Sequence, residues 1–236
     1  MILHAYFPKI LTTLLGGALV YLGIITFGNA LAFDLIYVST LIFTGLVCKK
    51  DINVVSIITV LIFQLIWESL AWNILVDENP AKVLFYLTAF YTVYCLRYDW
   101  LAKIAVTVVF IASLSELYWY FNDYSAPEIY WSILIMVSNI LIRHLVFYRV
   151  SFVDRYYPSK GESINLDWIV YKLSAALTIL QAIMIFEYLS RHLLGLDNIL
   201  LVYNSYSYII HCIGIITILA IFIENFKRLI PKRIKA

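Results

Sequence analysis

Residues 51–97, DINVVSIITVLIFQLIWESLAWNILVDENPAKVLFYLTAFYTVYCLR, decide the fold. They contain a polar start, a long apolar run that carries one glutamate, an acidic turn and a second apolar run. A helix of about 20 apolar residues is long enough to cross the hydrocarbon core of a bilayer. Two such runs joined by a short polar turn predict a transmembrane helical hairpin.

The layout of this hairpin recurs further along the chain. Glu68 follows Asp51 by 17 residues, and Glu116 follows Asp99 by the same 17 residues. Further matches at offsets of 47 or 48 residues link Thr59 with Thr107, Trp72 with Trp119, and Pro80 with Pro127. These matches predict hairpin repeats at 51–97 and 99–149, with a less regular third unit at 167–226.

Composition assigns the whole chain to the membrane. Of its 236 residues, 63% are hydrophobic and only 14% are charged, and the mean hydropathy is +0.88. Soluble domains carry about 25% charged residues, so this chain lacks an ordinary water-facing surface. We expect a single all-α transmembrane domain over residues 1–236, in contact with the lipid bilayer.

Eight apolar runs are candidate membrane spans, and they pair into four hairpins. They lie at 10–27, 33–47, 52–75, 83–96, 100–121, 129–148, 168–194 and 203–226. The second and fourth are the shortest, so their crossing requires local thinning of the bilayer or aromatic residues that extend their ends.

The distribution of basic residues predicts the orientation. With the N-terminus in the cytoplasm and eight spans, 15 of the 17 lysines and arginines fall on the cytoplasmic side, and only Lys82 and Arg191 lie outside. This asymmetry matches the positive-inside rule. We therefore expect a multi-pass protein of the plasma (inner) membrane with both termini in the cytoplasm.

Polar residues inside the spans are the candidates for chemistry. The predicted boundaries place Glu68, Glu116, Glu187 and His211 at a similar depth in the outer leaflet, with Gln64 one turn from Glu68 on the same helix face. Ionisable groups in hydrocarbon often mark ion or proton pathways. They also form hydrogen bonds between helices, and in that interpretation Glu187 pairs with Arg191 one turn later.

Basic residues on the predicted cytoplasmic side form a second group of candidates. The longest connection is expected at 149–167, and the C-terminal tail is basic. The residues that fit contact with anionic lipid headgroups, or with a cytoplasmic partner protein, are Arg149, Arg155, Lys160, Lys227, Arg228, Lys232 and Arg233.

Several classes of function lack sequence support. The three cysteines have no metal or disulfide spacing, and no phosphate loop or hydrolase motif is present. The sequence predicts no cofactor and no nucleic-acid partner. Glycines in the first span, including Gly16, Gly17 and Gly23, predict close approach of another helix, within the fold or from a second subunit.

These observations favour a non-enzymatic membrane protein that acts as an embedded subunit, sensor or scaffold of a larger, or self-associated, assembly. Uninterrupted spans and short loops suit that role. One alternative is an ion or proton channel, or a small transporter, that uses the outer-leaflet polar layer. Another is a lipid-directed intramembrane enzyme with glutamate or histidine as an acid–base group.

Overall fold

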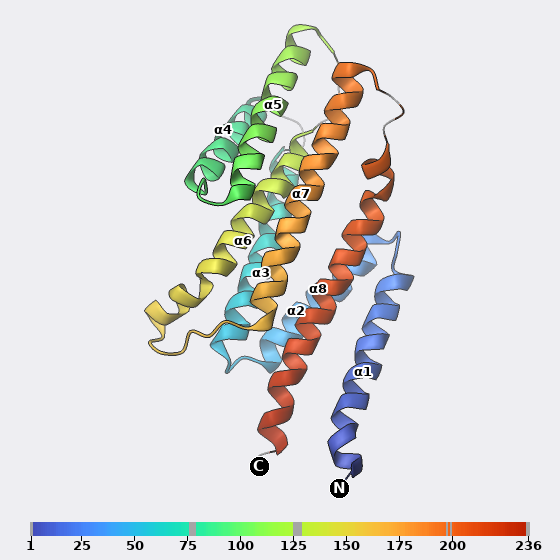
Figure 1. Ribbon diagram of the computed structural model, residues 1–236, viewed down its shortest axis with the longest axis vertical. Helices are drawn as coiled ribbons and strands as arrows, with labels where there is room; N and C mark the ends of the chain where they lie inside the picture. The colour runs from blue at the N-terminus through green and yellow to red at the C-terminus, as the bar shows by residue number, and fades with distance from the viewer. Residues whose placement is uncertain (1, 76–78, 125–128, 197, 199, 235–236) are drawn as a thin grey trace. The chain divides into compact units, whose positions relative to one another are not determined.

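The structure is a computed structural model that describes residues 2–75, 79–124, 129–196, 198 and 200–234, with side chains except those of 2–9, 72–75, 79–82 and 228–234. In these ranges it contains eight α-helices and no strands (Figure 1). The helices are α1 (Ile2–Ile25), α2 (Ala30–Val47), α3 (Ile52–Leu75), α4 (Asn79–Cys95), α5 (Trp100–Phe121), α6 (Tyr130–Tyr156), α7 (Asn165–Leu194) and α8 (Leu201–Ile234).

Six of these helices are long and apolar enough to cross a membrane: α2, α3, α5, α6, α7 and α8. In α1 and α4 the described apolar stretches are shorter, Ile10–Ile25 and Val83–Cys95. Large apolar side chains are exposed along the helices, for example Leu31 on α2, Phe110 on α5 and Ile216 on α8. Lipid is the solvent that such surfaces require, so the chain is a multi-pass membrane protein.

Helix boundaries correct one prediction. The connection expected at 149–167 is much shorter, because α6 continues to Tyr156 and α7 begins at Asn165. The added turns of α6 keep one face buried, with Val146, Arg149 and Val153 at spacings of three and four residues. Tertiary packing of that face extends the helix beyond the apolar run.

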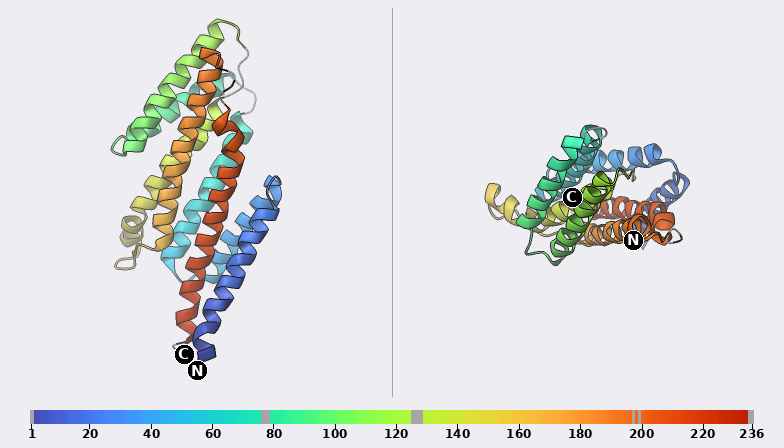
Figure 2. Two further views of the ribbon diagram at one scale, coloured as in Figure 1. Left: turned by 45° about the vertical axis from the view of Figure 1, so that its right-hand side comes forward. Right: turned by 90° about the horizontal axis from the view of Figure 1, so that it is seen from above.

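The chain divides into two compact units, described separately. The first contains residues 1–62, 146–170 and 208–236. Within it, α1 lies beside α8 in two views (Figures 1 and 2). A Cβ added to Gly23 would lie 2.6 Å from a side-chain carbon of Ile215, and one added to Gly16 would lie 3.3 Å from Leu219. The predicted close approach to first-span glycines is confirmed at these two positions, and it occurs within the fold.

The second unit contains residues 63–145 and 171–207. Its core includes Ala102, Ala105 and Ala112 on α5, which pack in one cluster with residues such as Ala89 on α4 and Ile185 on α7. Helices α4 and α5 contact each other and lie side by side in Figure 2. Small residues allow helix backbones to approach closely. The van der Waals packing that results stabilises helix association in lipid, where the hydrophobic effect between helices is absent.

Side chains and one glycine fix the ends of several helices. An oxygen of Asp51 accepts the backbone N–H of Asn53, and an oxygen of Asp99 accepts that of Leu101. Both aspartates that begin the proposed repeat thus cap the helix that follows them. Pro127, which was matched to Pro80 in the repeat, lies outside the described residues. Gly195 has φ +68° and ends α7 in an αL motif, with its N–H bonded to the Arg191 carbonyl four residues earlier.

Candidate functional site

The glutamates of the predicted polar layer make different contacts. On α3, Gln64 Nε2 donates to Glu68 Oε1 at 2.9 Å, as the one-turn spacing predicts. On α5, Glu116 lies close enough to Tyr86 of α4 and Tyr188 of α7 to interact with them electrostatically. Both glutamates therefore have polar neighbours inside the second unit.

Glu187 joins α7 to α8. Its two carboxylate oxygens accept the backbone N–H groups of Val202 at 2.6 Å and Tyr203 at 3.0 Å. These donors belong to the first turn of α8, which has no intrahelical acceptors for them, and a carboxylate there also interacts favourably with the helix dipole. Arg191, the partner expected from sequence, instead places its guanidinium carbon 5.4 Å from the centroid of the Tyr203 ring.

Aromatic rings surround His192 near the end of α7. Its ring lies 4.4 Å from that of Tyr188, and Trp119 meets both rings edge-on. Nδ1 of His192 lies 3.0 Å from the Tyr124 hydroxyl. This group ties the end of α5 to α7, and Tyr188 is also within electrostatic reach of Glu116.

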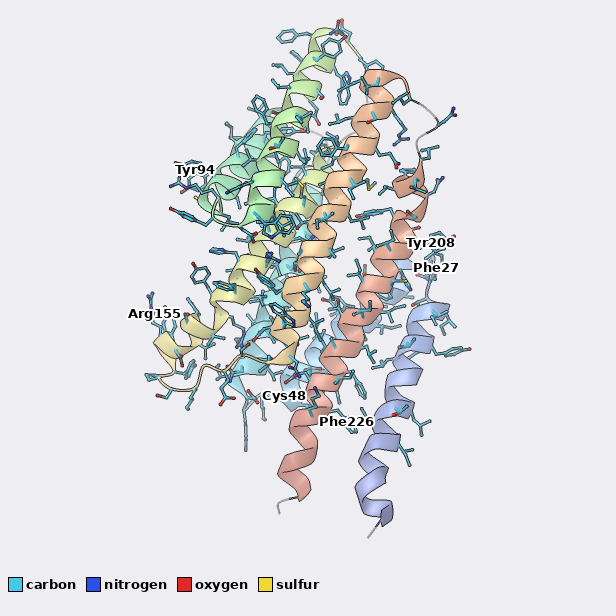
Figure 3. All side chains as sticks on the ribbon, viewed as in Figure 1. Phe27, Cys48, Tyr94, Arg155, Tyr208 and Phe226 are labelled. Atoms are coloured by element: carbon cyan, nitrogen blue, oxygen red, sulfur yellow. The ribbon has the colours of Figure 1, made fainter. Side chains whose placement is uncertain are left out.

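His211 lies in the first unit and connects α8 with α1. Its Nε2 is 2.5 Å from the carbonyl oxygen of Gly23, and its ring contacts those of Phe27 and Phe33. Phe27 also stacks on Tyr208, as Figure 3 shows. The structure places the three glutamates in the second unit and His211 in the first, so a common layer for all four remains a prediction. Among the described residues, no group of three or more His, Cys, Asp or Glu side chains could hold a metal ion.

The most extensive polar site is centred on Arg149, which is only 3% exposed. Its Nε donates to Asp167 Oδ1 at 2.7 Å and its Nη2 donates to Asp167 Oδ2 at 2.5 Å. Nη1 donates to the Ser56 hydroxyl at 2.9 Å and to the side-chain and backbone oxygens of Asn53 at 3.2 and 3.3 Å. Nη2 also donates to the Glu162 carbonyl at 2.7 Å. We call Asn53, Ser56, Arg149, Glu162 and Asp167 the Arg149 cluster.

The remaining contacts of this cluster hold the connection between α6 and α7. Asn53 Nδ2 donates to the Lys160 carbonyl at 2.9 Å, and its Oδ1 accepts the Glu162 N–H at 2.9 Å. Asp167 Oδ2 also accepts the Ile164 N–H at 2.9 Å. Each nitrogen of the guanidinium has an acceptor, as a buried arginine requires. The cluster therefore fastens the start of α3, the end of α6 and the start of α7 to one another.

No family model, curated protein or solved structure matches this chain.

Burial of Arg149 corrects a second prediction. Its guanidinium is bonded inside the protein, so it does not offer a surface contact for lipid or a partner. Arg155, Lys160 and Lys227 are exposed, as expected, and Arg155 points outward at the end of α6 in Figure 3. The other three predicted contact residues, Arg228, Lys232 and Arg233, have side chains outside the described part of the chain.

A second buried arginine follows the same pattern in the other unit. Arg143 Nε donates to Asp99 Oδ2 at 2.7 Å, and the guanidinium also contacts the carbonyl and the side chain of Tyr171. Asp99 thus caps α5 through one oxygen and binds α6 through the other. This contact ties α5, α6 and α7 together.

Sequence reasoning missed Asn53, Asp167 and the role of Arg143. Each lies at a polar helix start or just inside a span end, where an interfacial side chain is the ordinary interpretation. One signal was present: Arg143 and Arg149 each occur in a stretch whose apolar residues continue on both sides. Charges in such a position require an acidic partner, and Asp99 and Asp167 are the aspartates at the two neighbouring helix starts.

Proposed function

We propose that the chain crosses the inner membrane eight times, has both termini in the cytoplasm, and serves as a non-enzymatic subunit, sensor or scaffold in a larger assembly. The observation that carries this proposal is the Arg149 cluster, in which the charges at the predicted cytoplasmic end are bonded to each other and to backbone groups. A site for catalysis or transport needs groups that remain open to a substrate.

Other polar groups are also bonded within the protein. Glu187 caps α8, Gln64 donates to Glu68, and the Arg143–Asp99 pair links three helices. Such contacts favour a rigid helical framework with a fixed lipid-facing or protein-facing surface. A framework of this kind suits a scaffold that presents its outer surface to a partner.

Co-purification in mild detergent tests this proposal. We expect the chain, tagged and expressed at its native level, to elute in a complex larger than its 27.3 kDa mass, with a second protein or further copies of itself. Light scattering after size exclusion gives the protein mass without the detergent. A monomer that carries no partner, both in mild detergent and after crosslinking in membranes, would contradict the proposal.

A second candidate, conduction of protons or small cations, has its own support in the second unit. Three buried polar atoms there, Gln181 Oε1, Ser138 Oγ and Asn139 Oδ1, have no hydrogen-bond partner. An unpartnered buried polar group costs about 1–3 kcal/mol, and water or an ion in the interior would remove that cost. Gln181 also donates to the Tyr206 hydroxyl, which links α7 to α8 beside one of these atoms.

Proteoliposome flux separates the two candidates. Conduction predicts ion or proton flux by the wild-type chain and its loss in Glu68→Gln or Glu116→Gln. Glu162→Gln is the control, because that side chain is exposed in a connection and should leave flux unchanged. Absence of flux in the wild type, or flux that survives both changes, removes this candidate.

A further inference from the structure

Three exposed lysines are held near one another in the first unit: Lys49 and Lys50 in the turn before α3, and Lys160 in the connection between α6 and α7. Asn53 sets this arrangement, since it lies three residues after Lys50 and its Nδ2 donates to the Lys160 carbonyl at 2.9 Å. The Glu162 N–H returns a bond to Asn53 Oδ1. We call Lys49, Lys50 and Lys160 the three-lysine patch.

Three aspartate side chains near the three-lysine patch are bonded to backbone N–H groups or to Arg149. Asp51 Oδ1 accepts the Asn53 N–H at 3.2 Å, and Asp154 Oδ1 accepts the Gly161 N–H at 2.7 Å. Asp167 is paired with Arg149. One oxygen of Asp51 and one of Asp154 are thus bonded to backbone N–H groups, and the Glu162 side chain is exposed in the same connection as Lys160. The three exposed ammonium groups of the patch favour an anion.

Exposed aromatic residues occur at both ends of the connection that carries Lys160. Tyr156 and Tyr157 at the end of α6, and Trp168 in the first turn of α7, are all exposed. Tyrosine and tryptophan concentrate at the level of lipid headgroups, where an apolar ring and a polar edge are both solvated. We therefore expect the connection that carries Lys160 to lie at the headgroup level.

We propose that the three-lysine patch binds the phosphate of an anionic phospholipid headgroup. Lysine ammoniums attract phosphate as compact point charges, and the Arg149 cluster keeps their backbones in place through Asn53. The proposal rests on the multi-pass arrangement given above but is independent of which side of the membrane the patch faces. A lipid rather than a free phosphate is the ligand, because the exposed aromatic residues at the ends of the connection that carries Lys160 need the interface.

Native mass spectrometry of the full-length, delipidated chain tests the proposal. The chain is titrated in detergent with phosphatidylglycerol or phosphatidylcholine, and the lipid-bound fraction is measured. The test variant is Lys49→Gln/Lys50→Gln/Lys160→Gln. The control, Arg97→Gln/Lys103→Gln/Lys172→Gln, removes the same charge from exposed positions of the second unit. Both variants change exposed side chains, and unchanged circular dichroism melting shows that each is folded.

We expect the wild type and the control to bind phosphatidylglycerol in preference to phosphatidylcholine. The test variant should bind phosphatidylglycerol about fivefold more weakly for each lysine removed, since a basic residue near an anionic surface contributes about 1 kcal/mol. Equal loss in the test and control variants would overturn the proposal, because it indicates diffuse attraction. No loss in the test variant, equal binding of both lipids, or displacement of the lipid by inorganic phosphate would overturn it as well. A chain oriented oppositely in the membrane would still give the expected result, so the two proposals fail separately.

Discussion

Asp167→Asn should destabilise the chain more than any other single change at a helix end. The substitution keeps the size of the side chain and removes its charge, which leaves the Arg149 guanidinium buried without a counterion. The two side chains are 2% and 9% exposed, so water cannot replace the lost partner. Removal of one member of a buried ion pair costs about 3–5 kcal/mol. Because asparagine retains one acceptor, we expect a loss of about 3 kcal/mol in the free energy of unfolding.

The second ion pair provides a matched control. Asp99 accepts from Arg143 through a single oxygen, and its side chain is 19% exposed, so Asp99→Asn should cost only about 1 kcal/mol. Unfolding by sodium dodecyl sulfate in mixed micelles gives both values. Fluorescence of the six tryptophans, which include Trp168 next to Asp167, is a suitable probe together with circular dichroism. An Asp167→Asn loss equal to or smaller than that of Asp99→Asn would show that the more deeply buried Arg149–Asp167 pair is not the stronger contact.

Three further predictions use the same unfolding assay. Gly23→Leu should separate α1 from α8 and lower the free energy of unfolding by about 2 kcal/mol or more, because even a Cβ would lie 2.6 Å from Ile215. Gly17→Leu is the control and should change stability little, because nothing lies within 4 Å of its added Cβ. Glu187→Ala should cost about 2 kcal/mol through loss of the α8 cap, and Glu187→Gln should cost less because its amide oxygen still accepts one N–H. Arg149→Gln/Asp167→Asn should lose less than the sum of its two single changes, since the double variant leaves no unpaired charge; additive losses would contradict a direct pair.

The positions of several helices could be predicted from the sequence, because the lipid environment imposes a simple rule on the backbone. Backbone groups in hydrocarbon must be bonded within their own segment, so a sufficiently long apolar run becomes a helix. The runs at 52–75 and 100–121 give α3 and α5 with the same boundaries. The ends of α6 and α8 were not predictable from hydropathy, because their last turns are polar. Packing of Arg149 and Val153 keeps α6 helical past the apolar run.

Partners of the polar residues were predictable only where they lie one turn apart. Gln64 and Glu68 meet because helical geometry places them on one face. The same rule paired Glu187 with Arg191, but Glu187 binds the first turn of α8, whose free N–H groups are the stronger local donors. Arg149 meets Asn53 across 96 residues of sequence, and such a contact depends on helix packing that a single sequence does not reveal.

The proposed function depends most on the number and direction of the membrane crossings. A pair of reporter fusions after Ala236 tests both directly: green fluorescent protein, which fluoresces in the cytoplasm, and alkaline phosphatase, which is active only outside. With eight crossings and a cytoplasmic N-terminus, we expect the green fluorescent protein fusion to fluoresce and the phosphatase fusion to be inactive, with the same pattern for fusions after Lys50. Active phosphatase and no fluorescence at either position would contradict this arrangement.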